Sequence, residues 1–392
     1  MSQPATPPLL KDLNERTVLE TIRSGAPISR AEISRRAGIS KPTVSIALQS
    51  LLDVGLVRSA EPEGDGPRYG ATFFEPVAEA AGVLGLDLGA RFLRGGVCDL
   101  SGEVRARRDV ELAGADPTRV FDAAAELTEH LLEESGLPAP HVRSAVVGVP
   151  GVVDPATGRI SLAENAHGLD GLRVGAELER ELGVVVDIEN DVNLAALGER
   201  WGGVARDRED FAFLSIGTGL GAGLVLRGEL HRGHHGAAGE VDYAFGEGIE
   251  REVDPCAAAL LDFVRAEAAH GGHATALSEP FAVPDVFAAA RDGDALACAV
   301  VAEEARRIAL HIAPITAVAD PELVVLGGGL GMNGDLLLEP VRALLSEWLP
   351  YPPRVEISSL GESAVLMGAV ATGLQSALDN VFVSRRAIGS VP

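Results

Sequence analysis

The segment Asp187-Ile188-Glu189-Asn190-Asp191-Val192-Asn193-Leu194-Ala195-Ala196-Leu197-Gly198-Glu199 joins a strand to a helix. The run 184–188 is β-branched, as strands are, and the run 193–201 is apolar at helical spacing. The polar residues between them therefore stand at the carboxyl end of a strand, where open α/β sheets bind ligands. Asp191 could hydrogen-bond a ligand hydroxyl and accept its proton. The structural alternative is that Asn190 or Asp191 only caps the helix.

Three further segments follow in a fixed order: Leu214-Ser215-Ile216-Gly217-Thr218-Gly219-Leu220-Gly221-Ala222-Gly223-Leu224, then Gly236-Ala237-Ala238-Gly239-Glu240, then Leu323-Val324-Val325-Leu326-Gly327-Gly328-Gly329. As an ordered set, the four segments resemble the ROK family of sugar kinases and sugar-responsive repressors. The resemblance spans Val83 to Leu378. It implies an α/β protein with the two-lobed, actin-like and hexokinase-like ATPase fold.

The resemblance also implies roles for individual residues. Four residues would bind sugar: Asn165, Asn190, Asp191 and Glu240. In a kinase, Asp191 would be the general base that deprotonates the attacking hydroxyl. A second set would hold ATP phosphates and adenosine: Gly217, Thr218, Gly219, Gly221 and Gly328. On the residues alone, these glycines equally fit a hairpin turn and a tight strand-to-helix turn.

The first phosphate loop departs from the family pattern. ROK kinases carry Asp-x-Gly-Gly-Thr, whereas this chain has Asp87-Leu88-Gly89-Ala90-Arg91. Alanine restricts the backbone, and arginine is bulky where a phosphate should approach closely. Arg91 could instead attract a phosphate. We expect Asp87 and Gly89 to belong to a vestigial ATP site, with binding of ATP and Mg²⁺ weakened or lost.

The sugar and metal positions depart as well. Leu169 replaces a tryptophan that stacks on sugar in the family, and Tyr243 replaces a histidine that holds sugar and zinc. Between Gly246 and Leu261 the only cysteine is Cys256, where the family has a cluster. Because structural zinc needs four ligands, we expect no zinc and no other metal.

The front of the chain reads as a DNA-binding module. Three helices are expected: Leu13 to Ser24, Ser29 to Ala37, and Ser40 to Gly55. Ser29 with Glu32 forms a capping-box pattern. A tight turn containing Gly38 joins the second and third helices as in a helix-turn-helix. Two strand-like runs around a Gly/Pro/Asp turn then indicate a wing.

The charges of this module favour DNA as its partner. Residues 28–58 carry a net charge of +3, which can meet phosphates. The candidate DNA contacts are Arg35, Lys41, Thr43, Ser45 and Arg68. The alternative is a small interaction module whose charges are only solvated. The helix–turn–helix–wing order favours the DNA-binding interpretation.

The remaining chain has a different charge. The whole sequence of 392 residues has a net charge of −24, whereas residues 1–76 are balanced at nine basic and nine acidic residues. The acidic body therefore cannot coat nucleic acid, but its neutral front could approach DNA. No apolar run is long enough to span a membrane, and Met1 to Pro8 does not resemble a signal peptide. With three scattered cysteines, we expect a cytoplasmic protein.

These observations predict three units: a winged helix at 1–76, a first lobe at 77–190 joined by the helix 363–384, and a second lobe at 191–362. We expect a sugar-responsive repressor of carbohydrate-related genes that binds a sugar or sugar phosphate between its lobes. A homodimer or higher homo-oligomer would match a palindromic operator DNA. One alternative is an ATP-dependent, hexose-type sugar kinase that uses Asp191. The other is a regulator whose body only dimerises and binds a partner protein.

Overall fold

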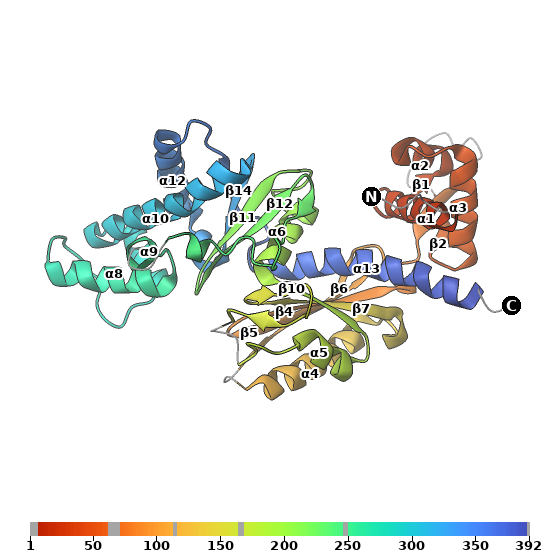
Figure 1. The fold of residues 1–392 in the computed structure, drawn as a ribbon, viewed down its shortest axis with the longest axis horizontal. Helices are drawn as coiled ribbons and strands as arrows, with labels where there is room; N and C mark the ends of the chain where they lie inside the picture. The colour runs from red at the N-terminus through yellow and green to blue at the C-terminus, as the bar shows by residue number, and fades with distance from the viewer. Residues whose placement is uncertain (1–6, 62–70, 113–115, 164–167, 246–249, 390–392) are drawn as a thin grey trace.

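The computed structural model describes residues 7–61, 71–112, 116–163, 168–245 and 250–389. Two five-stranded sheets, each covered by helices, form the body, and a small helical module lies at one end (Figure 1). Within these ranges, no helix combines the length and the apolar character that crossing a membrane requires. The architecture matches the predicted α/β body with an N-terminal winged helix.

The winged helix contains three helices and a small antiparallel sheet in the order β1-β3-β2. Its elements are α1 (Pro7–Arg23), β1 (Ile28–Ser29), α2 (Arg30–Ala37), α3 (Lys41–Asp53), β2 (Val57–Ala60) and β3 (Phe73–Pro76). The side chain of Ser29 accepts a hydrogen bond from the N–H of Glu32, and that of Ser40 accepts one from the N–H of Thr43. These caps satisfy N–H groups that the first helical turns leave open, so both starts follow from the sequence. The short strand β1 was not predicted.

The first large sheet has the strand order β10-β7-β4-β5-β6. Strands β4, β7 and β10 are parallel, and β5 and β6 continue from β4 as an antiparallel meander. The strands are β4 (Gly82–Leu88), β5 (Phe92–Asp99), β6 (Val104–Glu111), β7 (Val142–Val149) and β10 (Val185–Asn190); around them lie η1 (Ala78–Ala80), α4 (Pro117–Ser135), η2 (Ala139–His141), the hairpin β8 (Val152–Val153) with β9 (Ile160–Ser161), and α5 (Val174–Leu182). Strand β10 continues two residues beyond the predicted strand end, through Asn190.

The second large sheet repeats this arrangement, with the order β13-β12-β11-β14-β15. Strands β11, β14 and β15 are parallel, and β12 and β13 form the meander. The strands are β11 (Phe211–Ile216), β12 (Leu220–Leu226), β13 (Glu229–Leu230), β14 (Leu323–Gly327) and β15 (Arg354–Ile357); with them lie η3 (Val241–Ala244), α7 (Glu250–Val253), α8 (Ala257–His270), α9 (Val283–Arg291), α10 (Ala295–Ala319), α11 (Gly328–Gly331), α12 (Gly334–Trp348) and η4 (Gly361–Ser363). The two lobes are thus topological copies of each other.

Two crossing helices form the layer between the sheets. Helix α13 (Ala364–Gly389) packs on β4 and β7, and α6 (Asp191–Gly202) packs on β11 and β12 and across α13. A Cβ on Gly368 would lie 1.8 Å from the carbonyl oxygen of Leu194. A Cβ on Gly198 would lie 2.2 Å from that of Ala364. Glycine is therefore required at both positions, because the two helix backbones touch where the lobes meet.

The winged helix is packed directly against the first lobe. Leu100, which follows β5, is fully buried in the hydrophobic core of the winged helix beside Leu19 and Leu51. The N–H of Leu100 donates to the carbonyl of Ala78 at 3.0 Å. The ring Nδ1 of His141 lies 2.5 Å from the carbonyl oxygen of Glu79. A flexible tether would not allow these contacts, so the module and the lobe form a continuous packed unit.

Candidate functional site

A cavity of about 440 Å³ lies between the lobes and is lined by segments that follow strands of both sheets. The lining residues include Ala90 after β4, Pro150 and Gly151 after β7, Asn190 at the end of β10, Gly217 after β11 and Gly328 after β14. Carboxyl ends of parallel strands are where α/β sheets bind ligands. The two sheets therefore direct five strand ends at one cavity.

Asn190 occupies the start of helix α6, as the capping alternative predicted. Its Oδ1 accepts a hydrogen bond from the N–H of Asn193 at 2.9 Å, and its Nδ2 donates to the carbonyl of Gly151 at 2.9 Å. Both ends of the amide are thus used within the protein, although the residue also lines the cavity. The cap fixes the direction in which the next residue, Asp191, leaves the strand.

Asp191 is the most strongly perturbed carboxyl group of the cavity. Burial raises its pKa to about 7, and the neighbouring carboxylates of Asp87 and Glu240 act in the same direction. Burial also raises the pKa of Asp87 to about 6, although Arg94 opposes this, and it raises the pKa of Glu240. A carboxyl group with a pKa near neutrality can bind a hydroxyl and exchange a proton with it.

Glu240 is placed by a glycine that the fold requires. Gly239 has a φ of +97°, and a Cβ there would lie 1.7 Å from the carbonyl oxygen of Ala222. The N–H of Ala222 donates to the carbonyl of Gly239 at 2.8 Å, which pins the segment to β12. Glu240 and the two residues Asp242 and Tyr243 of η3 then line the cavity. Sequence reasoning did not select Asp242.

Glu189 was not predicted as a site residue, although it lies in the strand-to-helix segment 187–199. This buried carboxylate accepts hydrogen bonds from Nδ2 of Asn193 at 2.9 Å and from Nε of Arg232 at 2.6 Å. It therefore ties the first turn of α6 to the segment that leads to Glu240. In the sequence, the only indication that Glu189 belongs to the site is its position one residue before Asn190.

The second glycine loop lies open to the cavity. Gly217, Thr218 and Gly219 connect β11 to β12, and Gly221 also lines the cavity. A Cβ on Gly221 would lie 3.2 Å from Cγ2 of Val192, so this glycine lets β12 approach α6. Gly328 has a φ of +75°, and a Cβ there would lie 2.4 Å from the carbonyl oxygen of Ile216. The turn explanation and the phosphate-cradle explanation are therefore both compatible with this geometry.

The first loop is closed by side chains of the protein. Nη1 of Arg94 lies 3.4 Å from Oδ2 of Asp87, and Nε of Arg91 donates to Glu111 at 2.9 Å. The N–H of Gly89 donates to the carbonyl of Phe92. The N–H of Gly217 likewise donates within its own loop, to Gly219, so the backbone does not distinguish the two loops. The ion pair does, because a carboxylate paired with an arginine is a poor partner for Mg²⁺. Asp87, as it lies, does not fit Mg-ATP.

The residues at the positions where the family binds zinc do not fit a zinc ion. Tyr243 stands where the family pattern has a histidine, and the N–H of Cys256 donates to Oδ1 of Asp254 at 2.7 Å at the start of α8. Burial and Asp254 raise the pKa of the Cys256 thiol far above its usual range, which disfavours the thiolate that zinc requires. Within the described ranges, no group of three or more potential ligand side chains could hold a metal ion.

Two predicted contacts lie outside the described residues, namely Asn165 and Arg68. Leu169, at the position of the stacking tryptophan, is fully buried in the core of the first lobe. It therefore offers no surface to a ligand. The one aromatic side chain among the described lining residues is that of Tyr243.

The candidate DNA-binding residues lie on α2 and α3. The side chain of Arg35 is 71% exposed and pairs with Glu32, and Lys41 is exposed at the start of α3. Thr43 hydrogen-bonds Ser40, and Oγ of Ser45 donates to the carbonyl of Lys41. Ile46 was not predicted, yet its side chain is 65% exposed on the same helix. As the second helix of the helix-turn-helix, α3 is the expected recognition helix in the major groove. An exposed apolar side chain there suits the methyl group of thymine.

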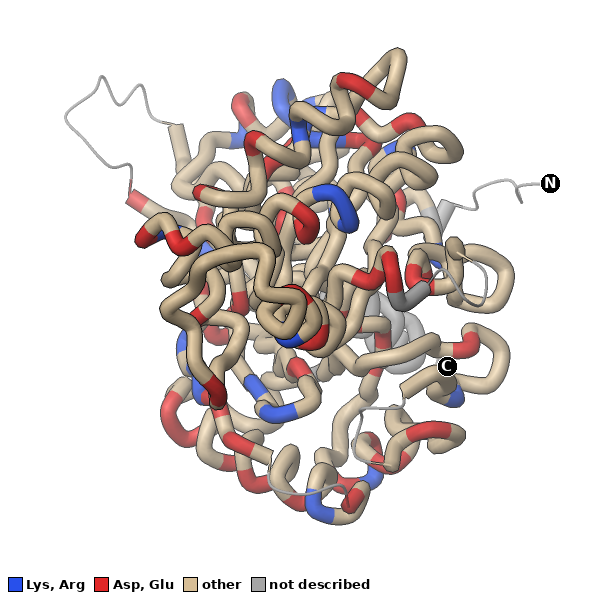
Figure 2. Tube along the Cα trace, turned by 90° about the vertical axis from the view of Figure 1, so that its left-hand side faces the viewer, with Lys and Arg blue, Asp and Glu red and all other residues tan. Residues whose placement is uncertain are grey.

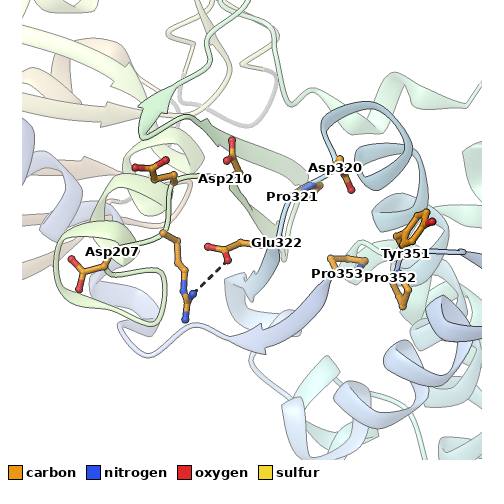
Figure 3. Close-up of a pocket in the computed structure, with 10 residues that line it drawn as sticks. Asp207, Asp210, Asp320, Pro321, Glu322, Tyr351, Pro352 and Pro353 are labelled. Carbon is orange, nitrogen blue, oxygen red and sulfur yellow. Dashed lines mark hydrogen bonds and ion pairs between the residues drawn. The ribbon is translucent and has the colours of Figure 1, made fainter.

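A larger cavity, of about 620 Å³, lies elsewhere in the second lobe (Figure 3). It is lined by residues that precede strands, among them Asp210 before β11, Glu322 before β14 and Pro353 before β15. Arg208 and Glu322 form an ion pair there, with 3.4 Å between Nη1 and Oε2. Because this is the amino end of the parallel strands, we do not take it as the principal site.

The winged helix packs on the first of two topologically repeated lobes, and a cleft lies between the lobes. This architecture defines a DNA-binding, two-lobed protein of the actin-like and hexokinase-like class. Residues 83–375 match the ROK family, and residues 12–66 match the MarR family. The chain belongs to the ROK family. The MarR-type match agrees with the predicted winged helix.

Individual relatives include both regulators and kinases. The chain is 26% identical to a xylose repressor of Caldicellulosiruptor bescii, with 93% of this chain and 96% of the repressor aligned. A ROK family transcriptional regulator, described as a homologue of the E. coli MLC protein, shares the fold with a TM-score of 0.80 and 24% identity over 96% of this chain and 98% of its own. A ROK family glucokinase from Streptomyces griseus, solved with glucose and AMPPNP, has a TM-score of 0.64 and 25% identity over 75% of this chain and all of its own.

Proposed function

We propose that this chain is a sugar-responsive transcriptional repressor that binds operator DNA through its winged helix and a sugar in the cleft between its lobes. The observation that carries the proposal is the joint presence of a packed winged helix and a cleft with Asp191 and Glu240 beside a closed first phosphate loop. Asn165, Asn190, Asp191 and Glu240 are the proposed sugar contacts. The proposed division is 1–76, 77–190 with 363–384, and 191–362.

Helix α6 offers a route from the sugar to the DNA. It begins in the cleft at Asp191, and Glu199 near its other end accepts hydrogen bonds from Ser358 and from the N–H of Val204. Trp201, in its last turn, packs against the first lobe. A Cβ on Gly102 would lie 3.4 Å from the Trp201 ring and 3.6 Å from Nη2 of Arg23 in the winged helix. Closure of the lobes would therefore alter contacts at the winged helix.

Such a response requires that the sugar bind one arrangement of the lobes more tightly than the other. In a homodimer, or a higher homo-oligomer, the response would change the separation of two winged helices and hence their fit to a palindromic operator. Because the chain resembles a xylose repressor over nearly its whole length, xylose is the first sugar to test.

The first experiment combines calorimetry with an assay for ADP release. Purified full-length protein is titrated with xylose, glucose and mannose, with and without Mg-ATP. Binding without turnover supports a sensor. Turnover that disappears in Asp191→Asn would make the protein a kinase, with Asp191 as its general base. Binding of no sugar would favour a regulator that only dimerises and binds a partner protein.

The second experiment measures DNA binding by fluorescence anisotropy with fragments from the chain's own promoter region. The chain has two lysines, and they form a matched pair: Lys41 on the recognition helix and Lys11 on α1. Lys41→Ala should weaken binding about tenfold and reduce its salt dependence, whereas Lys11→Ala should change little. Equal losses in both variants would contradict the assigned DNA-binding face.

The role of α6 in transmitting the effect of sugar to the winged helix can be tested with a variant and a matched control, because the chain has two tryptophans. Trp201→Leu should leave sugar affinity within about threefold of the original but reduce the effect of sugar on DNA affinity. Trp348→Leu, on the distant helix α12, should preserve that effect. If the two variants respond alike, α6 is not the route.

A further inference from the structure

The described lining of the cleft carries acidic side chains and no basic ones. Asp191, Glu240 and Asp242 contribute three carboxyl groups, and no Lys, Arg or His is among the described lining residues. The other polar groups that they contribute are hydroxyls and amides: Asn190, Ser215, Thr218 and Tyr243. Protein sites for phosphates and carboxylates normally supply arginine, lysine or a helix N-terminus.

The arginines on the segments that border the cavity are already paired. Arg94 lies 3.4 Å from Asp87 and 3.5 Å from Glu362, and Arg91 donates to Glu111. Arg232 donates to Glu189 at 2.6 Å. An anionic ligand would have to break one of these ion pairs before it gained a cation.

Backbone N–H groups are the competing feature. Those of the first turn of α6 are already used, because Val192 donates to the Asp191 side chain and Asn193 donates to the Asn190 side chain. Within the described residues, the N–H groups of Thr218 and Gly219 have no hydrogen-bond acceptor, so they could receive an anion. These two amide dipoles share the cavity with the carboxyl groups of Asp191, Glu240 and Asp242. Burial raises the pKa of Asp191 to about 7 and also raises the pKa of Glu240. The remainder of the chain adds to this field, with a net charge of −24 and acidic residues spread widely over the body (Figure 2).

We infer that the cleft selects uncharged sugars and basic amino sugars and rejects phosphorylated and carboxylated ones. The inference rests on the proposed function, because it narrows the ligand class of that same site. A sugar hydroxyl or ammonium group can donate to Asp191, Glu240 or Asp242. A phosphate ester would place negative charge against the same three groups, and each unit charge within several Å changes affinity by about tenfold in a partly buried site.

The test is calorimetry of the full-length protein in EDTA, so that no Mg²⁺ bridges the carboxylates to a phosphate. Two matched trios are titrated: glucose, glucosamine and glucose 6-phosphate, and mannose, mannosamine and mannose 6-phosphate; xylose is added as a pentose. Each neutral sugar that binds should bind at least about tenfold more tightly than its phosphate, and its amino derivative should bind at least as tightly.

The possible results distinguish a failure of the inference about ligand charge from a failure of the proposed sugar sensor. A phosphate that binds more tightly than its parent sugar would overturn the inference and leave the proposed sugar sensor intact. Absence of binding by every sugar and every phosphate would overturn the sensor itself, and the inference with it. Binding of neutral sugars together with rejection of their phosphates supports both.

A pair of variants tests the electrostatic cause. Asp242→Asn removes one charge from the cleft and should narrow the ratio of neutral to phosphorylated affinity by about threefold or more. Asp122→Asn makes the same change at an exposed position on α4, away from the cavity, and should leave the ratio unchanged. Thermal melting confirms that each variant is folded. An unchanged ratio in folded Asp242→Asn would overturn the inference.

Discussion

The two lobes build the same hairpin loop in opposite ways. In the first lobe, the loop after β4 contains Ala90 and Arg91, and Asp87 at the end of that strand is paired with Arg94. In the second lobe, the loop after β11 is Gly217-Thr218-Gly219, and it lies open to the cleft. The strand order agrees between the lobes, but the hairpin register does not: Leu88 pairs with Leu93, with four residues between them, whereas Ile216 pairs with Leu220, with three. The two loops therefore differ in length as well as in side chains. The first lobe thus keeps the strand order of the second, although an ion pair occupies the end of its first strand.

The largest expected effect tests whether the second lobe truly depends on glycine. Gly328→Ala combines a φ of +75° with a Cβ that would lie 2.4 Å from the carbonyl oxygen of Ile216. We expect it to lower the free energy of unfolding by about 3–4 kcal/mol, measured by urea denaturation. In Gly219→Ala the added Cβ meets no atom within 4 Å, so the loss should stay below about 0.5 kcal/mol. Similar losses in both variants would contradict the comparison.

The next effect concerns the ion pair that closes the first lobe. Arg94 lowers the pKa of Asp87, so Arg94→Met should move that pKa further above its present value of about 6. Above this pKa the buried carboxylate is ionised without its partner, and below it the group is neutral. The loss of unfolding free energy should therefore be about 2–3 kcal/mol at pH 8 and smaller at pH 5. A loss that does not change with pH would show that Arg94 acts only through packing.

A third experiment restores the family sequence in the loop after β4. Ala90→Gly combined with Arg91→Thr restores the loop pattern of the kinases, and it should strengthen binding of Mg-ATP by about tenfold, measured by calorimetry. Arg108→Thr on β6 serves as the control for loss of an exposed arginine. If the restored loop binds nucleotide no better than the original chain, the Arg94–Asp87 pair, and not the loop sequence, excludes it.

The smallest effect should come from the exposed ion pair. The side chains of Arg91 and Glu111 are 73% and 60% exposed, so solvent screens their attraction. Arg91→Met should change the free energy of unfolding by less than about 0.5 kcal/mol. A loss as large as that of Arg94→Met would mean that both arginines support the loop equally.

The sequence predicted the parts of the fold that local rules control. Ser29 and Ser40 cap their helices as expected, and the glycine segments of the second lobe follow strands as expected. Asp191 was placed at a strand end by the strand-to-helix change in residue pattern. Its role in binding remains a prediction, as do those of the other proposed site residues.

Contacts between distant segments could not be predicted in the same way. The pairing of Asp87 with Arg94 follows from the β4–β5 register, which places them opposite each other, and a hairpin alignment could have shown it. Asp242 could not be selected, because its neighbours along the chain do not reveal that η3 faces the cleft. Leu100 has the sequence pattern of an ordinary strand end, although it packs in the core of the winged helix with Leu19 and Leu51, which lie 81 and 49 residues earlier in the chain.

Leu100 limits how this protein can be recombined with others. A chimera that joins residues 1–76 to a foreign body would carry a DNA-binding module with an unfilled gap in its hydrophobic core. Exchange of DNA specificities between such regulators would therefore have to transfer the turn after β5 together with the winged helix. The unit of exchange is defined by packing, and it is discontinuous along the chain.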